Sequence, residues 1–521
     1  MTMRLAFQFV LVACFGAPCL GQQGPAGNAA PRAPDPAMLR CERLAGMDIS
    51  RGRITAREAI STGAFTPSGG KEVPNLPAFC RVAATLAPTA DSSIRIEVWM
   101  PSADWNGRFL GTGNGGFAGA ISYNSLADGV RKGYAVANTD MGLATPPGED
   151  AAIFEGRPER WKDWGYRATH EMTVVSKRIV AAYYGAPAKR SYFSGCSTGG
   201  EQGLMEAQRF PGDYDGIVAG GAANNRTRLH MAILWTFMAA QRDPAANLPA
   251  SKLPLLTKAV LAACSGGSGW IEDPRTCHFD PASLQCGGEA QEACLTAPEV
   301  ETVRRIYSGP VNPRTGERIY PGVPVGSEST WEAFYLKPGV ATAAPFQPIF
   351  QWVFGRNWDF RKFDYDRDVA TVDARLAAAV NATDPDLSAF RAAGHKLIAY
   401  HGWADALVMP GEAVSYYEAV VRRQKSEETT GAFYRLFMAP GVGHCGGGPG
   451  PNRFDMLAPM VDWVENGKAP ERIIATKVDA GGARVAARLL CPYPRVARYD
   501  GIGNPANAGS YACIAPSRST R

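Results

Sequence analysis

The chain has 521 residues, of which 45% are hydrophobic and 20% charged, and it carries a formal net charge of +5. This composition is that of a globular protein and excludes the disordered and fibrous classes, and the length predicts either one large domain with an insertion or two domains. Since no run of basic residues accompanies the small positive charge, we expect no nucleic-acid partner.

Residues 1–21 have the layout of a secretory signal peptide. Arg4 precedes an apolar stretch at residues 5–20, and small and polar residues follow it. The stretch from Leu11 to Cys14 also resembles a lipoprotein cleavage box, so lipid anchoring at Cys14 is a minor alternative. No later stretch is apolar for long enough to span a bilayer. We therefore expect a secreted or periplasmic protein without a membrane span.

The cysteine count suits an oxidising compartment. Of 12 cysteines, two fall in the expected signal peptide, which leaves an even number. Sequence proximity suggests four disulfide bonds: Cys41–Cys80, Cys264–Cys277, Cys286–Cys294 and Cys491–Cys513. Cys196 and Cys445 then remain, although counting alone does not fix the pairing. Because no Cys-x-x-Cys pair is present, we expect no zinc site.

The predicted strands and helices fall into two groups along the chain. After a lead-in rich in Pro, Gly and Ala at residues 22–37, strands are predicted at 94–100, 134–139 and 191–193, and helices at 166–184 and 201–209. The alternation returns late, with strands at 396–400 and 433–438 and helices at 412–424 and 454–465. Such an alternation of strands and helices favours an α/β protein with a largely parallel sheet.

The middle of the chain has a different character. Between residues 223 and 385 the alternation is lost, and Pro, Gly, Cys and aromatic residues predominate. We interpret this stretch as a lid domain inserted into a hydrolase domain that comprises residues 22–222 and 386–521. The predicted fold class is therefore α/β, with an α/β-hydrolase fold that carries a large inserted lid.

The pentapeptide Gly-Cys-Ser-Thr-Gly at residues 195–199 matches the G-x-S-x-G nucleophile elbow, and it lies between a predicted strand and a predicted helix. A serine hydroxyl needs an imidazole within hydrogen-bond reach. His444 lies in a Gly-rich loop after a strand, and Asp405 follows another strand. The order Ser, Asp, His is that of an α/β-hydrolase. We expect Ser197 to be the nucleophile, His444 the base and Asp405 the residue that orients it.

Other residues compete for these roles. Five further histidines lie in helical, strand-end or polar loop settings and are interpreted as structural: His170, His230, His278, His395 and His401. Cys196 is an alternative nucleophile, but secretion and the available partner Cys445 argue against a free thiolate. If these two cysteines are bonded to each other, they bring Ser197 and His444 together through their chain neighbours.

The oxyanion of an acyl-transfer reaction needs backbone donors. We expect one from Thr198, the residue after the nucleophile, and one from Gly113 in the loop at residues 111–116. The same loop also spells G-x-G-x-x-G, with Asp140 about 24 residues further on, which in form is a dinucleotide fingerprint. Because a protein outside the cytoplasm has little access to NAD, the oxyanion role is preferred.

These motifs resemble the tannase and feruloyl esterase family of α/β-hydrolases, whose hallmark is a Cys-Ser, Asp and His-Cys arrangement with a disulfide between the two cysteines. The resemblance extends over nearly the whole chain and rests on residues 195–200, 210–220, 400–405, 440–450 and 490–494. It implies a Cys196–Cys445 bond and hydrolysis of phenolic-acid esters through an acyl-enzyme. The four disulfides suggested above agree with the family's pattern.

The sequence departs from this family in two places. Members commonly hold calcium in an Asp-rich stretch between the cysteines that match Cys264 and Cys277, but here Glu272, Asp273 and Asp280 alone offer too few oxygens. We expect no cofactor, and calcium binding that is weak or absent. Relatives that hydrolyse mono(2-hydroxyethyl) terephthalate use a lid arginine, and none occurs between Lys337 and Arg356. Specificity for terephthalate is therefore not supported.

The predicted lid is rich in aromatic residues, with 11 between Trp331 and Tyr365. Phe346, Phe350 and Trp352 are candidates for contact with an aromatic substrate, and the alternative is that such rings form the lid's own core. We expect a secreted serine esterase for small aromatic esters, for example from plant cell walls, with feruloyl or other hydroxycinnamoyl esters first and galloyl esters second.

Three alternatives to this function stay open. One is a catalytically silent secreted protein that binds a phenolic compound or a polysaccharide, which a fluorophosphonate would not label. The others are a peptidase on the same fold and a hydrolase of the mono(2-hydroxyethyl) terephthalate type. The sequence does not indicate the oligomeric state.

Overall fold

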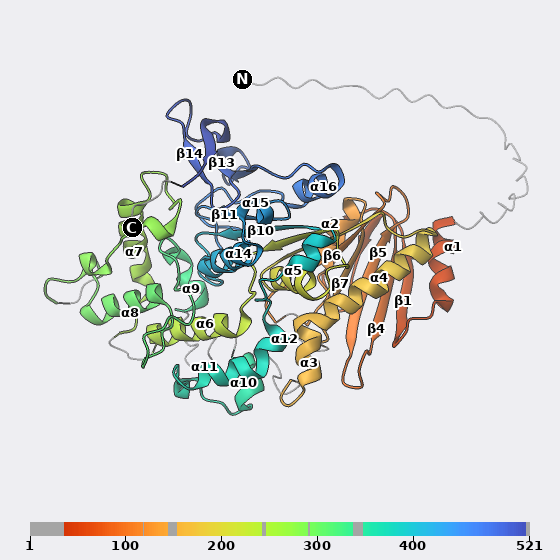
Figure 1. The fold of residues 1–521 in the computed structure, drawn as a ribbon, viewed down its shortest axis with the longest axis horizontal. Coiled ribbons are helices and arrows are strands. Elements are labelled where there is room, and N and C mark those ends of the chain that lie inside the picture. The colour runs from red at the N-terminus through yellow and green to blue at the C-terminus, as the bar shows by residue number, and fades with distance from the viewer. Residues whose placement is uncertain are drawn as a thin grey trace, which may run out of the picture.

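A nine-stranded sheet forms the centre of the computed structural model, which describes residues 36–117, 119–143, 154–241, 246–289, 292–336 and 347–516 (Figure 1). The predicted signal peptide, Cys14 and Phe346 lie outside these residues. In spatial order the strands are β1 (Gly52–Ile60), β4 (Phe79–Leu86), β5 (Ile94–Pro101), β7 (Ala135–Thr139), β6 (Arg108–Thr112), β8 (Arg190–Cys196), β9 (Gly216–Gly220), β10 (Lys396–Gly402) and β11 (Tyr434–Ala439).

The sheet is antiparallel at one end and parallel over the rest. β1, β4, β5 and β7 pair antiparallel, whereas β7, β6, β8, β9, β10 and β11 pair parallel. The carboxyl ends of parallel strands meet at one edge, where loops gather functional residues from distant parts of the sequence. The segments that follow β8, β10 and β11 all begin at this edge.

Helices cover both faces of the sheet because successive strand residues point to opposite sides. In β8, Phe193 packs into a core with α1 (Pro36–Arg43), α4 (Ala168–Tyr184), α5 (Thr198–Arg209) and α14 (Pro410–Gln424). Its neighbour Tyr192 packs on the opposite face with α2 (Tyr123–Arg131) and α16 (Leu457–Asn466). No helix in the described part of the chain has both the length and the hydropathy that crossing a bilayer requires.

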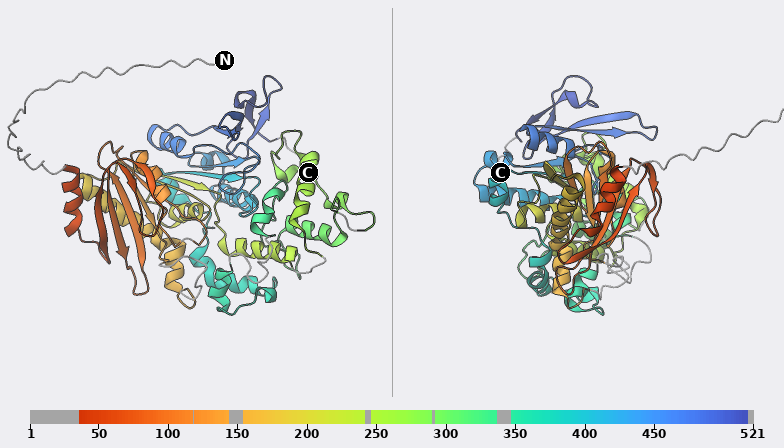
Figure 2. Two further views of the ribbon diagram at one scale, coloured as in Figure 1. Left: turned by 180° about the vertical axis from the view of Figure 1, so that it is seen from behind. Right: turned by 90° about the vertical axis from the view of Figure 1, so that its right-hand side faces the viewer.

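A long segment at residues 221–395 separates β9 from its sheet neighbour β10. Figures 1 and 2 show most of its helices at the end of the molecule opposite β1 and β4. Its core is apolar and aromatic. The helices are α6 (Arg226–Gln241), α7 (Leu253–Cys264), α8 (Ala297–Ser308), α9 (Trp331–Phe334), α10 (Pro348–Phe354), α11 (Asp368–Val372), α12 (Ala378–Val380) and α13 (Ser388–Ala392).

The remaining elements lie at the borders of the sheet. Two antiparallel hairpins follow α16, and ion pairing between Arg488 and Glu272 joins the first of them to the inserted segment. The bounds are β12 (Ile473–Val478), β13 (Arg484–Leu490), β14 (Val496–Tyr499), β15 (Tyr511–Ile514), β2 (Gly63–Phe65), β3 (Val73–Leu76), α3 (Pro158–Lys162) and α15 (Glu427–Gly431).

The predicted strands and helices of both flanking regions are present, with ends displaced by a few residues. The predicted helix at 166–184 is α4, which continues directly from a π-helical turn at Asp163–Arg167. Within the inserted segment, only a helical stretch around His230 was expected, and it is part of α6. The other helices of the segment had no predicted counterparts. The division of the chain into a hydrolase domain and a lid at 223–385 stays a prediction, although the break between β9 and β10 falls at nearly the same place.

Candidate active site

Ser197 lies at the sharp turn between the end of β8 and the start of α5. Its backbone has φ 64° and ψ −121°, a conformation that non-glycine residues rarely adopt. The turn is held because Ser197 N–H donates to Gly220 O at 2.9 Å, while Ser197 O accepts from Ala223 N–H at 3.2 Å. The turn also needs a glycine, since a Cβ on Gly195 would lie 2.6 Å from the carbonyl of Gly199. The local sequence therefore places the Ser197 hydroxyl at the edge of the sheet.

The structure brings Ser197, His444 and Asp405 together in one hydrogen-bonded row. His444 Nε2 lies 2.9 Å from Ser197 Oγ, and His444 Nδ1 lies 2.8 Å from Asp405 Oδ2. A carboxylate only accepts hydrogen bonds, so Nδ1 carries the proton and Nε2 is left to accept from the serine hydroxyl. This arrangement can activate a serine for attack on a carbonyl carbon.

Asp405 is fully buried yet held as a carboxylate. Burial alone would raise its pKa, but the electrostatic attraction to His444 and the hydrogen bonds from His401 and His444 outweigh burial, so the pKa lies well below its ordinary value. The N–H groups of Leu407 and Val408 also donate to Oδ1, each at 2.9 Å. The negative charge is therefore available to orient His444.

His401 is a site neighbour that the sequence interpretation left as structural. Its Nε2 lies 3.2 Å from Asp405 Oδ2 and 2.8 Å from Val408 O, and its side chain is buried. Since a carbonyl only accepts, Nε2 carries the proton and points it toward both oxygens. The four-residue spacing from His401 to Asp405 across a strand end was the signal that could have found it.

A disulfide joins Cys196 to Cys445, the residues adjacent to Ser197 and His444. The two cysteines are 249 residues apart in sequence and 5.9 Å apart between Cα atoms. The other four bonds are Cys41–Cys80, Cys264–Cys277, Cys286–Cys294 and Cys491–Cys513, which are the pairs suggested by sequence proximity. Because Cys196 is bonded, it is excluded as a free thiolate nucleophile.

The structure corrects the assignment of Gly113 as an oxyanion donor. Its N–H donates to Ser194 O at 3.0 Å, because Gly113 continues the parallel ladder between β6 and β8. The next N–H, of Asn114, donates to Gln202 Oε1 at 2.8 Å. Among the described residues, the N–H groups of Gly115 and Gly116 have no acceptor, and both glycines line the cavity in front of Ser197.

The Thr198 N–H, at the first position of α5, is also without an acceptor among the residues described. An oxyanion could thus receive hydrogen bonds from α5 and from the 115–116 loop. The dinucleotide alternative does not fit, because Asp140 is buried and accepts from Arg95 Nε at 2.7 Å and from Gly142 N–H at 2.9 Å. Its carboxylate is not available to a ribose.

A cavity of about 320 Å³ opens in front of Ser197. Its wall is mainly apolar, and Arg226, His230 and His444 are the titratable residues in it. Such a volume accommodates one aromatic ring and its ester group. The apolar wall is formed by Ala223, Leu229, Ile233, Leu407 and Val408.

Two of the predicted substrate contacts lie in a protein core instead of this cavity. Phe350 is 0% exposed and stacks on Trp358, and Trp352 is 3% exposed and stacks on Phe154. Neither side chain is part of the cavity wall. The expectation that they touch substrate is therefore corrected: burial of large aromatic surface in the inserted segment explains why they are aromatic.

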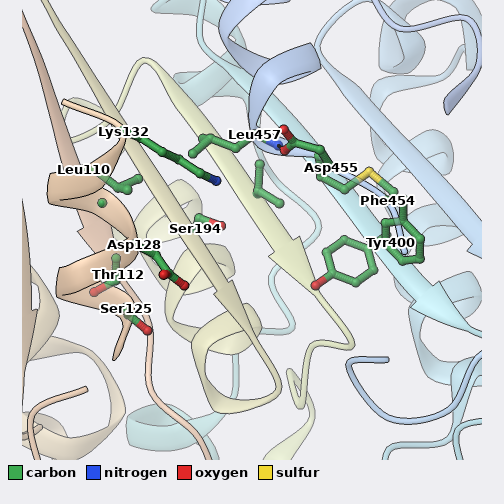
Figure 3. A pocket seen from close by; sticks show the side chains of 13 residues that line it. Leu110, Thr112, Ser125, Asp128, Lys132, Ser194, Tyr400, Phe454, Asp455 and Leu457 are labelled. Carbon is green, nitrogen blue, oxygen red and sulfur yellow. Dashed lines mark hydrogen bonds between the residues drawn. The ribbon is translucent and has the colours of Figure 1, made fainter. Parts of the chain in front are cut away.

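A second hollow, of about 410 Å³, lies on the face of the sheet that α2 and α16 cover (Figure 3). Asp128 of α2, Lys132 directly after this helix, Tyr400 of β10 and Asp455 surround it, with Ser194 in its floor. It shares no residue with the cavity in front of Ser197. The candidate catalytic residues thus belong to the smaller cavity.

The carboxylates proposed for a degenerate calcium loop are engaged elsewhere. Glu272 accepts from Arg488 Nη2 at 3.0 Å, Asp273 pairs with Arg275 at 2.6 Å, and Asp280 pairs with Arg304 at 2.9 Å. A hard cation needs six to eight oxygens, so these residues do not fit calcium.

A different group of possible metal ligands lies among the described residues. His170, Glu206 and Asp213 have candidate ligand atoms within 4.8 Å of one another. The His170 ring already bonds to Asp213 at 2.7 Å, and Lys177 Nζ also contacts Asp213 through its carbonyl. The neighbouring ammonium group opposes a further positive charge at this position.

Comparisons with known proteins agree with this geometry. A family model described as tannase and feruloyl esterase matches residues 80–514. The chain is 39% identical to an uncharacterised esterase of Xanthomonas campestris pv. campestris, with 92% of each chain covered. It is 33% identical to mono(2-hydroxyethyl) terephthalate hydrolase of Piscinibacter sakaiensis, with 85% of each covered. The crystal structure of feruloyl esterase B from Aspergillus oryzae superposes with a TM-score of 0.85 at 28% identity, over 92% of this chain and 100% of that one.

Proposed function

Since the chain belongs to the tannase and feruloyl esterase family and is therefore a carboxylic ester hydrolase, we propose that it cleaves esters of phenolic acids through an acyl-enzyme formed on Ser197. The family and the solved relative confirm the α/β-hydrolase fold expected from the sequence. The observation that carries the proposal is the row of hydrogen bonds from Ser197 through His444 to Asp405.

The proposed reaction has two halves. His444 Nε2 takes the proton of Ser197 Oγ as this oxygen attacks the ester carbonyl, and it then gives the proton to the leaving alcohol. Water, activated by the same nitrogen, releases the acid and restores Ser197. Asp405 orients His444 and stabilises the imidazolium. The N–H groups of Thr198 and of Gly115 or Gly116 bind the oxyanion in each half.

For the substrate, the proposal is a feruloyl or other hydroxycinnamoyl ester first and a galloyl ester second. A mainly apolar cavity of about 320 Å³ suits a flat aromatic acid, and the solved relative named feruloyl esterase B supports the first choice. The relative named mono(2-hydroxyethyl) terephthalate hydrolase keeps that ester as an alternative substrate. The hydrogen bond between Ser197 and His444 favours a catalytic function over binding without catalysis.

Two further parts of the proposal concern setting and cofactors. Five disulfides support action outside the cytoplasm, in the periplasm or the medium. The occupied carboxylates at Glu272, Asp273 and Asp280 support a reaction that needs no calcium.

A substrate panel tests the proposal. The purified enzyme should be assayed by kcat/KM on methyl ferulate, caffeate, coumarate, sinapate and gallate, with mono(2-hydroxyethyl) terephthalate and a p-nitroanilide peptide as comparisons. We expect the hydroxycinnamates to lead and the amide to resist. Preference for the terephthalate ester would replace the substrate assignment, and no turnover of any ester would favour a silent binder.

A further inference from the structure

Arg226, the first residue of α6, forms a buried ion pair with Glu201 of α5 next to the nucleophile elbow. Arg226 Nε donates to Glu201 Oε2 at 2.8 Å, and Nη2 contacts the same oxygen. The side chains are only 3% and 2% exposed. Arg226 also lies over the ring of Trp164 at 5.1 Å. A residue of the inserted segment is thereby fixed against the helix that begins at Thr198.

The Arg226 guanidinium also reaches the Thr198 side chain. Its Nη2 donates to Thr198 Oγ1 at 2.9 Å, and Thr198 Oγ1 lies 2.6 Å from Gly116 O. A guanidinium can only donate, so the hydroxyl accepts from Arg226 and sends its own proton to the carbonyl of Gly116. The direction of each bond is therefore fixed, from Arg226 through Thr198 to Gly116.

This bridge joins the two sides of the proposed oxyanion hole. Thr198 supplies one N–H from α5, and Gly116 belongs to the loop that supplies the other. A second link runs in parallel, because Gly199 N–H donates to Asn114 O at 2.7 Å. The Gly199–Asn114 hydrogen bond joins α5 directly to the 111–116 loop. The Thr198 hydroxyl also joins α5 to this loop, but it is held in turn by Arg226 of the inserted segment.

The surroundings of the Arg226–Glu201 ion pair indicate that it positions neighbouring groups. They favour this role over direct binding of the substrate and over stabilisation of the fold. Two of the guanidinium nitrogens are committed to Glu201 and Thr198, and the cavity wall nearby is mainly apolar. Glu201 Oε1 is buried without a hydrogen-bond partner among the described residues. A buried ion pair that is only partly satisfied is weak evidence for stabilisation, because the cost of desolvation can exceed the attraction.

We propose that Arg226 and Glu201 are positioning residues that hold the Thr198 hydroxyl against Gly116, so that both oxyanion donors stay aligned on the substrate carbonyl oxygen. The role rests on the serine-esterase reaction proposed above. It makes the inserted segment part of the catalytic geometry as well as a wall of the cavity.

Steady-state kinetics on two substrates test this role. Methyl ferulate carries its aromatic ring on the acyl side of the ester, whereas p-nitrophenyl acetate has only an acetyl group there and carries its ring on the leaving alcohol. For Arg226→Met and for Thr198→Val we expect kcat to fall roughly tenfold to a hundredfold on both substrates, since small misplacements of catalytic groups have effects of this size. KM should change less than about threefold, because a positioning defect acts on the transition state. Arg226→Lys and Thr198→Ser should recover most of the loss.

A double variant and a matched control sharpen the test. If Arg226 acts through Thr198, the Arg226→Met/Thr198→Val protein should lose no more kcat than the worse single variant. Arg304→Met removes an exposed ion pair with Asp280 in the same inserted segment and should leave kcat unchanged. Thermal unfolding shows whether each variant is folded. If Arg226→Met does not fold, the kcat of Thr198→Val compared with that of Thr198→Ser tests the positioning role.

Three results would overturn the positioning role. They are a kcat within twofold of wild type in folded Arg226→Met, a loss confined to KM for methyl ferulate, and losses that multiply in the double variant. A wild-type enzyme inactive on every ester would instead count against the proposed function.

Discussion

Asp405 shows how single residues acquire their chemistry from contacts made after folding. It lies after β10 with no exposed surface, and two backbone N–H groups and two histidines surround its carboxylate. The two histidines lower its pKa in spite of burial. A charge that is stabilised in the folded state in this way contributes both to catalysis and to stability.

Replacing Asp405 by Asn is expected to separate these two contributions. The variant should lose roughly 10³- to 10⁴-fold in kcat, because the amide no longer holds the Nδ1–H tautomer of His444. The variant should also be less stable than the wild type, and the difference in unfolding free energy should be largest above pH 3.8, the pKa of Asp405 in the unfolded chain. The difference should shrink as the pH falls below 3.8, because the pKa of Asp405 is lower in the folded than in the unfolded protein. Urea titrations at pH 6 and pH 3 measure this, and a deficit that grows in acid would contradict it.

The sequence predicted those site residues that lie next to a recognisable motif or strand. Ser197, His444 and Asp405 each follow a recognisable strand, and their order is characteristic of the fold. The assignment of Gly113 failed because its N–H is consumed by pairing with Ser194, which depends on where the ladder between β6 and β8 ends. His401 was missed since its contact with Asp405 depends on the path of the chain after β10.

Among the elements, the Cys196–Cys445 bond joins the end of β8 to the loop after β11. These strands are not neighbours, because β9 and β10 lie between them. The bond therefore spans the edge of the sheet and sets the separation of the Ser197 and His444 loops. The remaining disulfides close shorter loops, of 8 to 39 residues in sequence separation.

Removing this bond is expected to affect catalysis beyond stability. The Cys196→Ser/Cys445→Ser variant should lose about 2–5 kcal/mol of stability, and at temperatures where it is folded its kcat should still fall at least about tenfold, because the Ser197–His444 distance is no longer fixed. Cys286→Ser/Cys294→Ser, which opens a bond in the inserted segment, is the control. Equal kcat in the two folded variants would refute a catalytic contribution.

The elements themselves were predictable where apolar periodicity is long and regular. The strand, turn and helix around Ser197 and the late strands appear nearly where the sequence placed them. Helices α7–α13 were not predicted, because several are only one or two turns long and the aromatic residues of the segment face one another instead of repeating along one side. For this reason Phe350 and Trp352 were mistaken for substrate contacts.

On the scale of the whole molecule, the inserted segment is held by both the sheet and the C-terminal hairpins. Arg226 connects it to α5, Arg488 pairs with Glu272, and Arg275 donates to Tyr493 Oη at 3.1 Å. The charge of Glu272 thus joins the inserted segment to the first C-terminal hairpin.

Chelation is therefore expected to have no effect. Incubation with EDTA followed by gel filtration should change the melting temperature by less than about 1 °C and leave kcat on methyl ferulate unchanged, because the carboxylates already have cationic partners. Loss of either property with recovery on added calcium would show that the segment binds the ion after all.

The most direct measurement of the central claim is covalent labelling of the nucleophile. The enzyme should be treated with a fluorophosphonate, assayed for residual hydrolysis of methyl ferulate, and digested for peptide mass spectrometry. We expect one adduct, on Ser197, formed in proportion to lost activity and absent from Ser197→Ala, which should retain the fold and lose at least about 10³-fold in kcat. Full activity in Ser197→Ala, or inactivation with the adduct on another residue, would contradict the account.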